Sequence, residues 1–336
     1  MPFEAQAFQL AKDPEHPGEN QDAYAFDPER GIAAVADGVA SAIFSGIWAE
    51  TLVEAVVRQP PEPDDAQPFA EWLAACRRQW DERIDTTGLA WFQKAKLPTG
   101  AFSTLLWAQL VPLQPDHAGA FGGWRLQARA IGDSCLFHVR HGELIRHFPL
   151  GAAAEFEHNP LALGSVDLGR DALMQFASLD VTCFPDDHLL LATDAVAEWL
   201  YRRVEANEPP DWPTLWEAGP AEWVDQINAL RAAREMRYDD ATLVVLRVAR
   251  EASREPADEL PPAEEPLSAE DLAEEPWAPA QDVPQETADA AVEGESSRSK
   301  AALDQIFDGV GQLADEGVRA GRTLLDRLRE QFRRRE

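Results

Sequence analysis

A short apolar run ends in a carboxylate followed by a glycine. Residues 32–36 read Ile-Ala-Ala-Val-Ala, and Asp37 and Gly38 follow directly. The small and branched side chains predict a buried strand, and the glycine lets the backbone turn sharply and approach whatever the carboxylate holds. Mg²⁺ and Mn²⁺ prefer carboxylate, carbonyl and water oxygens. Because many strands end in such a turn, a metal site here depends on carboxylates at other strand ends.

Further carboxylates stand where other predicted strands begin or end: Asp22, Asp133, Asp194, Asp239 and Asp240. The strand opened by Asp22 and the strand closed by Asp37 predict an antiparallel hairpin, which places these two residues near the same edge. Several like charges at one edge repel one another unless a cation neutralises them. Two metal ions about 3.5–4 Å apart can convert a bridging water to a hydroxide that attacks phosphorus. The pattern therefore predicts a multi-metal site.

The order of predicted elements indicates an α+β fold. Strands come first, two long helices follow over residues 41–58 and 69–95, and further strands occupy 101–192. More helix then fills 195–203 and 212–236, before a last strand over 241–248. This order is typical of sheets packed face to face with helices outside.

Composition narrows the function classes. The chain has 336 residues, of which 60 are acidic and 30 basic, so its formal net charge is −30. A nucleic-acid partner is not expected, because phosphate contacts need a basic surface. The first twelve residues lack the pattern of a signal peptide, and no apolar run reaches the roughly 18 residues that a membrane-spanning helix needs. We therefore expect a cytoplasmic protein.

Cysteine and histidine offer no second metal site by their spacing. The three cysteines, Cys76, Cys135 and Cys183, include no Cys-x-x-Cys pair, so we expect reduced, buried thiols and neither a disulfide framework nor a zinc site. The histidines are expected on strands or at the surface: His138, His141, His147, His158 and His188.

Composition also divides the chain. Residues 1–250 have the pattern of a globular domain, whereas 251–300 are rich in proline, alanine and carboxylates and predict a disordered acidic linker. Residues 301–336 predict an amphipathic helix with a basic end. This helix would dock on the body, pair with a second copy, or make a peripheral contact with an anionic membrane surface or a partner protein.

Six motifs within residues 1–250 occur in the order seen in the protein phosphatase 2C family. They are Asn20-Gln21-Asp22, Val35-Ala36-Asp37-Gly38, Gly100-Ala101-Phe102-Ser103-Thr104-Leu105, Ile131-Gly132-Asp133-Ser134, Leu191-Ala192-Thr193-Asp194 and Asp239-Asp240-Ala241-Thr242-Leu243. This part of the chain resembles the short bacterial form of that metal-dependent Ser/Thr phosphatase domain. The resemblance implies a four-layer α-β-β-α sandwich with two antiparallel sheets, and a bimetal centre in the cleft between them.

The resemblance also implies roles for individual residues. Asp37, Asp194 and Asp239 would be the catalytic metal ligands, with Asp37 bridging two ions and Gly38 offering its carbonyl. Asp22 would bind metal through water, Asp133 would match the ligand of a third ion, and Asp240 and Asn20 would support the site. The cofactors would be two or three Mn²⁺ or Mg²⁺ ions, and a metal-bridging hydroxide would hydrolyse phosphoserine or phosphothreonine. The partner would be a phosphoprotein, such as a Ser/Thr kinase or its targets.

The chain departs from the family pattern where substrate phosphate is usually bound. The family's arginine is missing from residues 13–19, which read Asp-Pro-Glu-His-Pro-Gly-Glu. The substrate-binding residues are therefore unknown, with Lys12 and His16 as candidates. Two alternatives stay open: a catalytically weak phosphatase-like module that binds or regulates a phosphoprotein, and a metal-dependent hydrolase of small phosphate esters.

Overall fold

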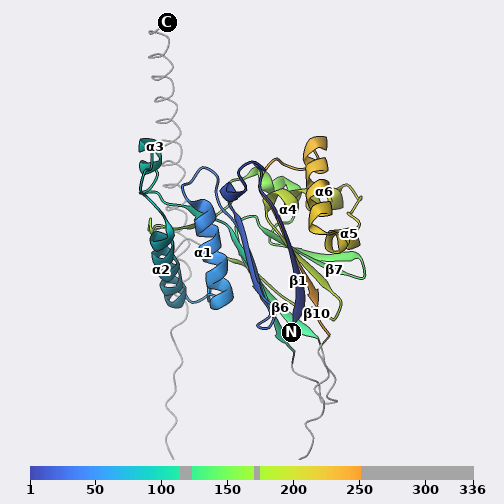
Figure 1. The fold of residues 1–336 in the computed structure, drawn as a ribbon. Coiled ribbons are helices and arrows are strands. Elements are labelled where there is room, and N and C mark those ends of the chain that lie inside the picture. The colour runs from blue at the N-terminus through green and yellow to red at the C-terminus, as the bar shows by residue number, and fades with distance from the viewer. Residues whose placement is uncertain (114–122, 170–174, 251–336) are drawn as a thin grey trace, which may run out of the picture. The chain divides into compact units, whose positions relative to one another are not determined.

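The computed structural model describes residues 1–113, 123–169 and 175–250 (Figure 1). The linker predicted over 251–300 and the amphipathic helix predicted over 301–336 lie outside the described residues. Within the described part of the chain, no helix is both long enough and apolar enough to cross a membrane.

Two five-stranded antiparallel sheets form the centre of the molecule. The first has the order β1 (Phe3–Leu10), β12 (Ala241–Val248), β11 (His188–Ala192), β7 (Cys135–Arg140) and β8 (Glu143–Phe148). The second has the order β10 (Ala177–Cys183), β6 (Trp124–Ile131), β5 (Leu105–Pro112), β3 (Ile32–Asp37) and β2 (Asp22–Asp27). A separate two-stranded ladder joins β4 (Phe102–Ser103) to β9 (Leu163–Gly164). The predicted α+β class with two antiparallel sheets is confirmed.

Alternation along the strands explains why the sheets are apolar on both faces. In β3, Ala33 and Val35 pack with Leu136 and Val244 of the other sheet, in a core between the two sheets. The intervening residues of β3, such as Ala34, belong to a second core that includes the first long helix. Successive side chains of a strand point to opposite faces, so a strand covered on both sides reads as an unbroken apolar run.

Helices cover the outer faces of the two sheets (Figure 1). One set is α1 (Ser45–Arg58) and α2 (Ala66–Arg83), followed by the short α3 (Trp91–Lys94). The other is α4 (Asp194–Glu205), α5 (Trp212–Glu217) and α6 (Pro220–Ala233). Single turns of 3₁₀-helix occur at Pro17–Glu19 and Ala153–Glu157. The order of layers is helices, sheet, sheet, helices, as the three apolar cores show.

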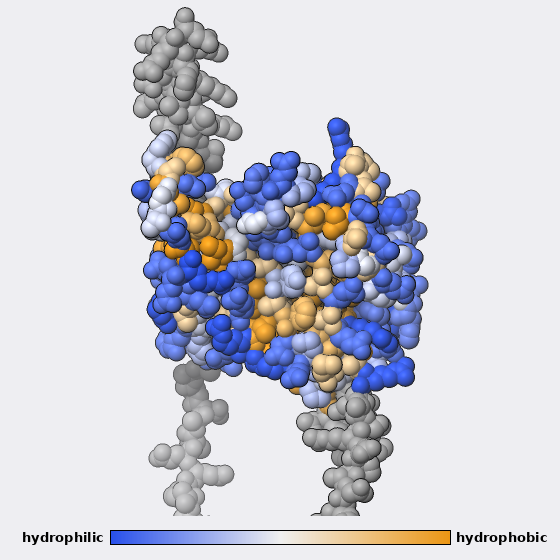
Figure 2. Space-filling view, viewed as in Figure 1, coloured by the Kyte–Doolittle hydropathy of each residue, from blue (hydrophilic) through white to orange (hydrophobic). Residues whose placement is uncertain are grey.

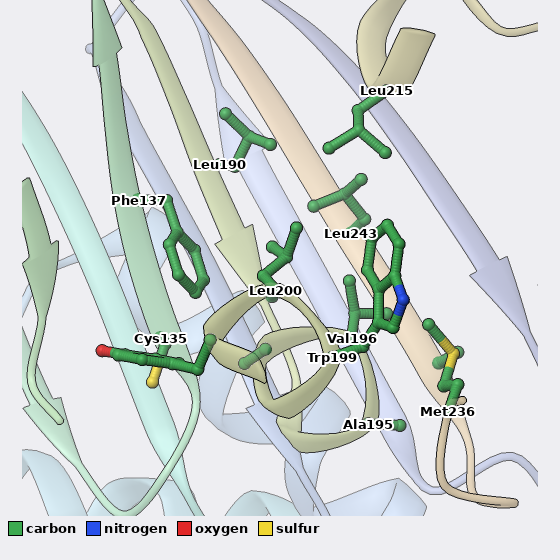
Figure 3. Packing of buried hydrophobic residues seen from close by; sticks show 14 of the residues in the cluster. Cys135, Phe137, Leu190, Ala195, Val196, Trp199, Leu200, Leu215, Met236 and Leu243 are labelled. Carbon is green, nitrogen blue, oxygen red and sulfur yellow. The ribbon is translucent and has the colours of Figure 1, made fainter. Parts of the chain in front are cut away.

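The outer core beside α4 is the one that positions part of the site. Figure 3 shows Val196, Trp199 and Leu200 of α4 against Phe137 and Leu243 of the first sheet. Trp199 is the most exposed of these side chains, at 7%, so the helix is held by nearly complete apolar burial.

Two predicted helices are wrong in extent. The helix predicted over 69–95 ends at Arg83, because the Asp85 carboxylate accepts a hydrogen bond from Thr87 N and Gly88 has a φ of +73°. Such a side-chain turn competes with helical hydrogen bonding. The helix predicted over 212–236 is divided between α5 and α6, where Pro220 occupies the first turn of a new helix.

Candidate metal centre

The strand register brings Asp22 and Asp37 directly opposite each other. They are paired residues of β2 and β3, as the hairpin prediction required. Gly38 follows in a confined place, where an added Cβ would lie 2.8 Å from both Gln21 O and Ser45 O. Only glycine fits there without moving backbone. The turn after β3 is therefore set by the close approach of residues 21 and 45.

The backbone of Asp37 is held by two other motifs. Its N–H donates to Thr104 Oγ1 at 3.1 Å, and its carbonyl accepts from Ser103 Oγ and Thr104 N, both at 2.9 Å. Thr104 Oγ1 also lies 2.9 Å from Ser134 Oγ. Gly132, at a φ of +99°, permits this contact, because a Cβ there would meet Thr104 Cγ2 at 2.5 Å. The Ser/Thr positions of these motifs thus fix the main chain that carries the Asp37 carboxylate.

A hydroxyl on the other sheet holds Asp22. Thr193 Oγ1 donates to Asp22 Oδ2 at 2.7 Å and accepts from Thr242 N at 3.0 Å. Asn20 supports the same residue, since its Oδ1 accepts from Asp22 N at 2.9 Å. Asp22 is 6% exposed. The threonine therefore ties a carboxylate of the second sheet to the two central strands of the first.

Asp239 and Asp240 have different surroundings. Asp240 is buried, and its carboxylate accepts from Lys12 N at 2.7 Å and from Gln21 N at 2.9 Å, which joins two separate loops. The Asp239 side chain is 36% exposed, and its Oδ1 lies 3.3 Å from Lys12 Nζ. Asp240 thus acts within the fold, whereas Asp239 presents a carboxylate to solvent beside a lysine.

Three charged residues of the site were not identified from the sequence: Lys12 as a partner of the aspartates, Glu198 and Arg237. The Arg237 guanidinium forms ion pairs with Asp194 Oδ2 and, at 2.7 Å, with Glu198 Oε2. The sequence contained a signal for Glu198, because this residue follows Asp194 by four positions and therefore lies on the same face of the helix. Arg237 had no such signal, since its contacts arise only when the loop before β12 meets α4.

Burial and neighbouring charges oppose the ionisation of several aspartates of the site. Burial, and then the charges of Asp22, Asp194, Asp133 and Asp239, raise the pKa of Asp37 well above its usual value. Burial and the Asp194 charge likewise raise the pKa of Asp22 well above normal. Burial raises the pKa of Asp133 to about 6 and that of Asp194 to about 7. The charges of neighbouring aspartates therefore make it harder for Asp37, Asp22 and Asp194 to ionise.

The donor set fits a hard divalent cation. It consists of oxygen ligands only, which Mg²⁺ and Mn²⁺ prefer, and the buried Asp133 Oδ1 has no hydrogen-bond partner. Within the described part of the chain, no three of the predicted ligands bring their carboxylate oxygens within 4.8 Å of one another. Across residues 1–113, 123–169 and 175–250, the one trio of acidic, histidine or cysteine ligand atoms within 4.8 Å of one another lies elsewhere, at His138, Cys183 and Asp187. Arg237 and Lys12 instead provide positive charge to the aspartates.

The raised pKa values predict a pH dependence of stability in the metal-free protein. A folded carboxyl whose pKa is raised binds more protons than its unfolded counterpart, whose pKa is 3.8. Stability therefore falls as the pH rises from about 4 to about 7. At about 1.4 kcal/mol per pH unit, Asp133 alone contributes about 3 kcal/mol.

Thermal unfolding in EDTA at pH 5 and pH 8 measures this effect. We expect a melting temperature lower at pH 8 by roughly 5 °C or more, and we expect Mn²⁺ to remove most of the difference. A metal-free protein that is equally stable at both pH values would contradict the repulsion between these carboxylates.

The trio at His138, Cys183 and Asp187 is a buried ion-pair network. Asp187 accepts from Arg140 Nε at 2.7 Å, Arg140 Nη2 at 2.8 Å and Phe184 N at 2.9 Å, and it lies 2.7 Å from His138 Nε2. Its charge is thus already balanced by the guanidinium. His138 lies on a strand, as expected, and its side chain is buried, with 1% of the residue exposed. The cysteines are free and buried, as predicted.

A cavity of about 760 Å³ opens beside Asp22 and Lys12. Its lining also includes Phe44 of the turn before α1, together with Phe92 and Lys96 from the segment around α3. Phe92 is 55% exposed, and Figure 2 shows hydrophobic surface next to α3, at the upper left of the molecule. The cavity thus joins Asp22 to an apolar wall and to two lysines.

The sequence matches no protein-family model and no curated protein. Solved structures of Ser/Thr phosphatases do match. The structure of PppA, "a key regulatory component of T6SS in Pseudomonas aeruginosa", is 19% identical, with 74% of this chain and 98% of that chain covered and a TM-score of 0.44. The catalytic domain of the serine/threonine phosphatase PstP in complex with two manganese ions is 17% identical, with coverage of 74% and 99% and a TM-score of 0.46.

A third match is MsPP, a PPM Ser-Thr phosphatase from Mycobacterium smegmatis in complex with cacodylate. It is 18% identical, with 73% and 98% of the two chains covered and a TM-score of 0.42. The chain is similar in structure to PPM-type Ser/Thr phosphatases. This similarity concerns the fold alone.

Proposed function

We propose that this protein is a metal-dependent phosphatase that removes phosphate from phosphoserine or phosphothreonine in proteins. The observation that carries the proposal is the gathering of carboxylates from both sheets around Asp37, whose ionisation four other aspartates oppose. Like charges placed together, with Asp22, Asp133 and Asp194 buried, are unfavourable unless a cation neutralises them. The candidate metal ligands are all oxygen atoms, and phosphoryl transfer is the chemistry that paired Mg²⁺ or Mn²⁺ ions commonly support.

Asp37, Asp194 and Asp239 would hold two Mn²⁺ or Mg²⁺ ions, with Gly38 offering its carbonyl, Asp22 acting through water, and Asp133 as a further acidic ligand. Bound there, the ions would supply an activated water and draw charge away from the phosphate. The protein's own part is to keep these carboxylates in place. The contacts of Thr104 with Asp37 and of Thr193 with Asp22 do this, because both are fixed within the sheet framework.

Lys12 is the residue we propose to contact the substrate phosphate. It lines the cavity, and its Nζ lies 3.3 Å from Asp239 and 3.9 Å from Asp240. Burial lowers the pKa of Lys12, but the charges of Asp239 and Asp240 outweigh burial and the pKa is raised. The ammonium therefore stays charged at neutral pH, as a phosphate-binding group must.

Phosphate release from a phosphothreonine peptide tests the activity directly. The full chain is assayed with Mn²⁺ and with EDTA, beside the Asp239→Asn variant. We expect turnover only with Mn²⁺, and a loss of at least about 100-fold in the variant, because a ligand has lost its charge. Asp180→Asn is the matched control, since Asp180 is exposed on β10 and paired with Arg125.

The alternative function is a phosphatase-like module that binds a phosphoprotein without turning it over. Two observations favour it: residues 13–21 contain no arginine, and Arg237 and Lys12 already pair with predicted ligands. A folded chain that binds Mn²⁺ and the phosphopeptide but releases no phosphate would establish this alternative. Hydrolysis of small phosphate esters without hydrolysis of the peptide would point to the third class considered from the sequence.

A further inference from the structure

Arg237 brings a positive charge to the part of the site that is formed by Asp194 and Glu198. Its guanidinium pairs with Asp194 and, at 2.7 Å, with Glu198. Its charge also lowers the pKa of Asp133, against the larger effect of burial. Asp194 and Glu198 are 8% and 7% exposed, so neither carboxylate can rely on water to stabilise its charge. In the metal-free protein, Arg237 thus compensates the charge of Asp194 directly, and it shares Glu198 with Arg202.

The core holds Arg237 in this place. The preceding residue, Met236, is 5% exposed, and Figure 3 shows it on the same side of the outer core as Ala195 and Trp199 of α4. Ala195 in turn follows Asp194 directly. Apolar packing therefore sets the distance between the backbone of residue 237 and the start of α4. The guanidinium reaches the carboxylates because of this packing, and a planar fork of donors suits two oxygens at once.

We propose that Arg237 is a built-in counterion of the metal centre, which holds Asp194 and Glu198 in the absence of metal and competes with a divalent cation for Asp194. The inference rests on the proposed function in that it assumes a metal centre at these aspartates. Its consequence is that this chain binds a divalent cation at Asp194 more weakly than the same ligands would without the arginine. Glu198, which the sequence interpretation did not include, becomes part of the site as the second anchor of Arg237.

The Arg237→Gln variant of the full chain tests the proposal by Mn²⁺ binding, measured by titration calorimetry without any substrate. We expect Mn²⁺ to bind roughly tenfold more tightly, because a positive charge is removed from oxygens that bind a cation. We also expect a lower melting temperature in EDTA and a larger rise on adding Mn²⁺, since the metal then replaces the positive charge that Asp194 has lost.

Two further variants keep the result interpretable. Arg237→Lys retains the charge and is expected to leave the Mn²⁺ affinity within about threefold of the parent chain. Arg202→Gln removes an ion pair with the same Glu198 from a side chain that is 59% exposed, and should change the affinity little. Should Arg237→Gln fail to fold without metal, refolding it in Mn²⁺ and comparing it with Arg237→Lys gives the same contrast.

The outcomes separate the inference from the proposed function. If the parent chain binds Mn²⁺ and Arg237→Gln binds it equally or more weakly, the counterion role is wrong while the metal centre stands. If only Arg237→Gln binds Mn²⁺, the arginine is a complete block and the counterion role is supported. If neither chain binds Mn²⁺, the metal centre itself is wrong, and the inference falls with it.

Discussion

The Asp37→Asn variant is expected to lose metal-dependent hydrolysis and, at the same time, to be more stable than the parent chain without metal. Asp37 is the predicted bridging ligand, and the charges of Asp22, Asp194, Asp133 and Asp239 all act on it. An amide cannot bridge two cations as a carboxylate does, so we expect kcat to fall by at least about 10³-fold. Phosphate release from the phosphothreonine peptide in Mn²⁺ measures this loss.

The stability change has the opposite sign because the same charge is unfavourable when no metal is bound. Burial and like charges raise the pKa of Asp37, so replacing its carboxyl with a neutral amide removes repulsion at pH 8. The backbone contacts of Asp37 with Ser103 and Thr104 do not involve its side chain and should persist. In EDTA at pH 8, we expect the free energy of unfolding of Asp37→Asn to exceed that of the parent chain by about 1 kcal/mol.

A combined result identifies the role of Asp37. Lost activity with raised metal-free stability is what a metal ligand produces. Lost activity with lowered stability would indicate damage to the fold, and turnover within about tenfold of the parent chain would show that Asp37 is not a ligand.

The Asp187→Asn variant is expected to lose about 3–5 kcal/mol of unfolding free energy, because one partner of a buried ion pair is removed while the others remain. Asp187 is 1% exposed and accepts from Arg140 twice, from Phe184 N, and interacts with His138. An amide group presents two N–H donors where the surrounding groups are donors too. Urea unfolding at pH 7 measures the change.

Asp186→Asn provides the matched control. The neighbouring Asp186 side chain is 36% exposed and pairs with Arg247 and Arg250 at the surface, so its loss should cost less than about 1 kcal/mol. Equal losses in the two variants would show that the buried network contributes no more than an exposed ion pair. Because Asp187 and Asp194 lie at opposite ends of β11, we expect neither variant to change Mn²⁺ binding.

The effect of Asp187 should also depend on pH. Burial raises the pKa of this carboxyl, but hydrogen bonds from Arg140 and His138 outweigh burial and hold the pKa below its usual range. A carboxyl with a lowered folded pKa contributes stability above its unfolded pKa and loses it as the pH falls. The difference between the parent chain and Asp187→Asn should therefore narrow below about pH 4.

The sequence by itself determined the framework of this protein. The unbroken apolar run of residues 32–36 required a strand covered on both faces, and the structure places it between an inter-sheet core and a helical one. The hairpin pattern placed Asp22 and Asp37 near the same edge, and the register pairs them directly. These features are local, because the period of the side chains and the chemistry of a turn need no distant partner.

Only the tertiary structure decided which groups surround those carboxylates. Thr193 reaches Asp22 across the two sheets, Lys12 lies beside Asp239, and Arg237 pairs with Asp194 and Glu198. No spacing in the sequence indicates these pairs, since residues such as 22 and 193 are far apart along the chain. Burial decided how these aspartates ionise. An aspartate on the surface is stabilised by water and behaves as an ordinary acid. Once packing removes that water, its negative charge needs a cation nearby.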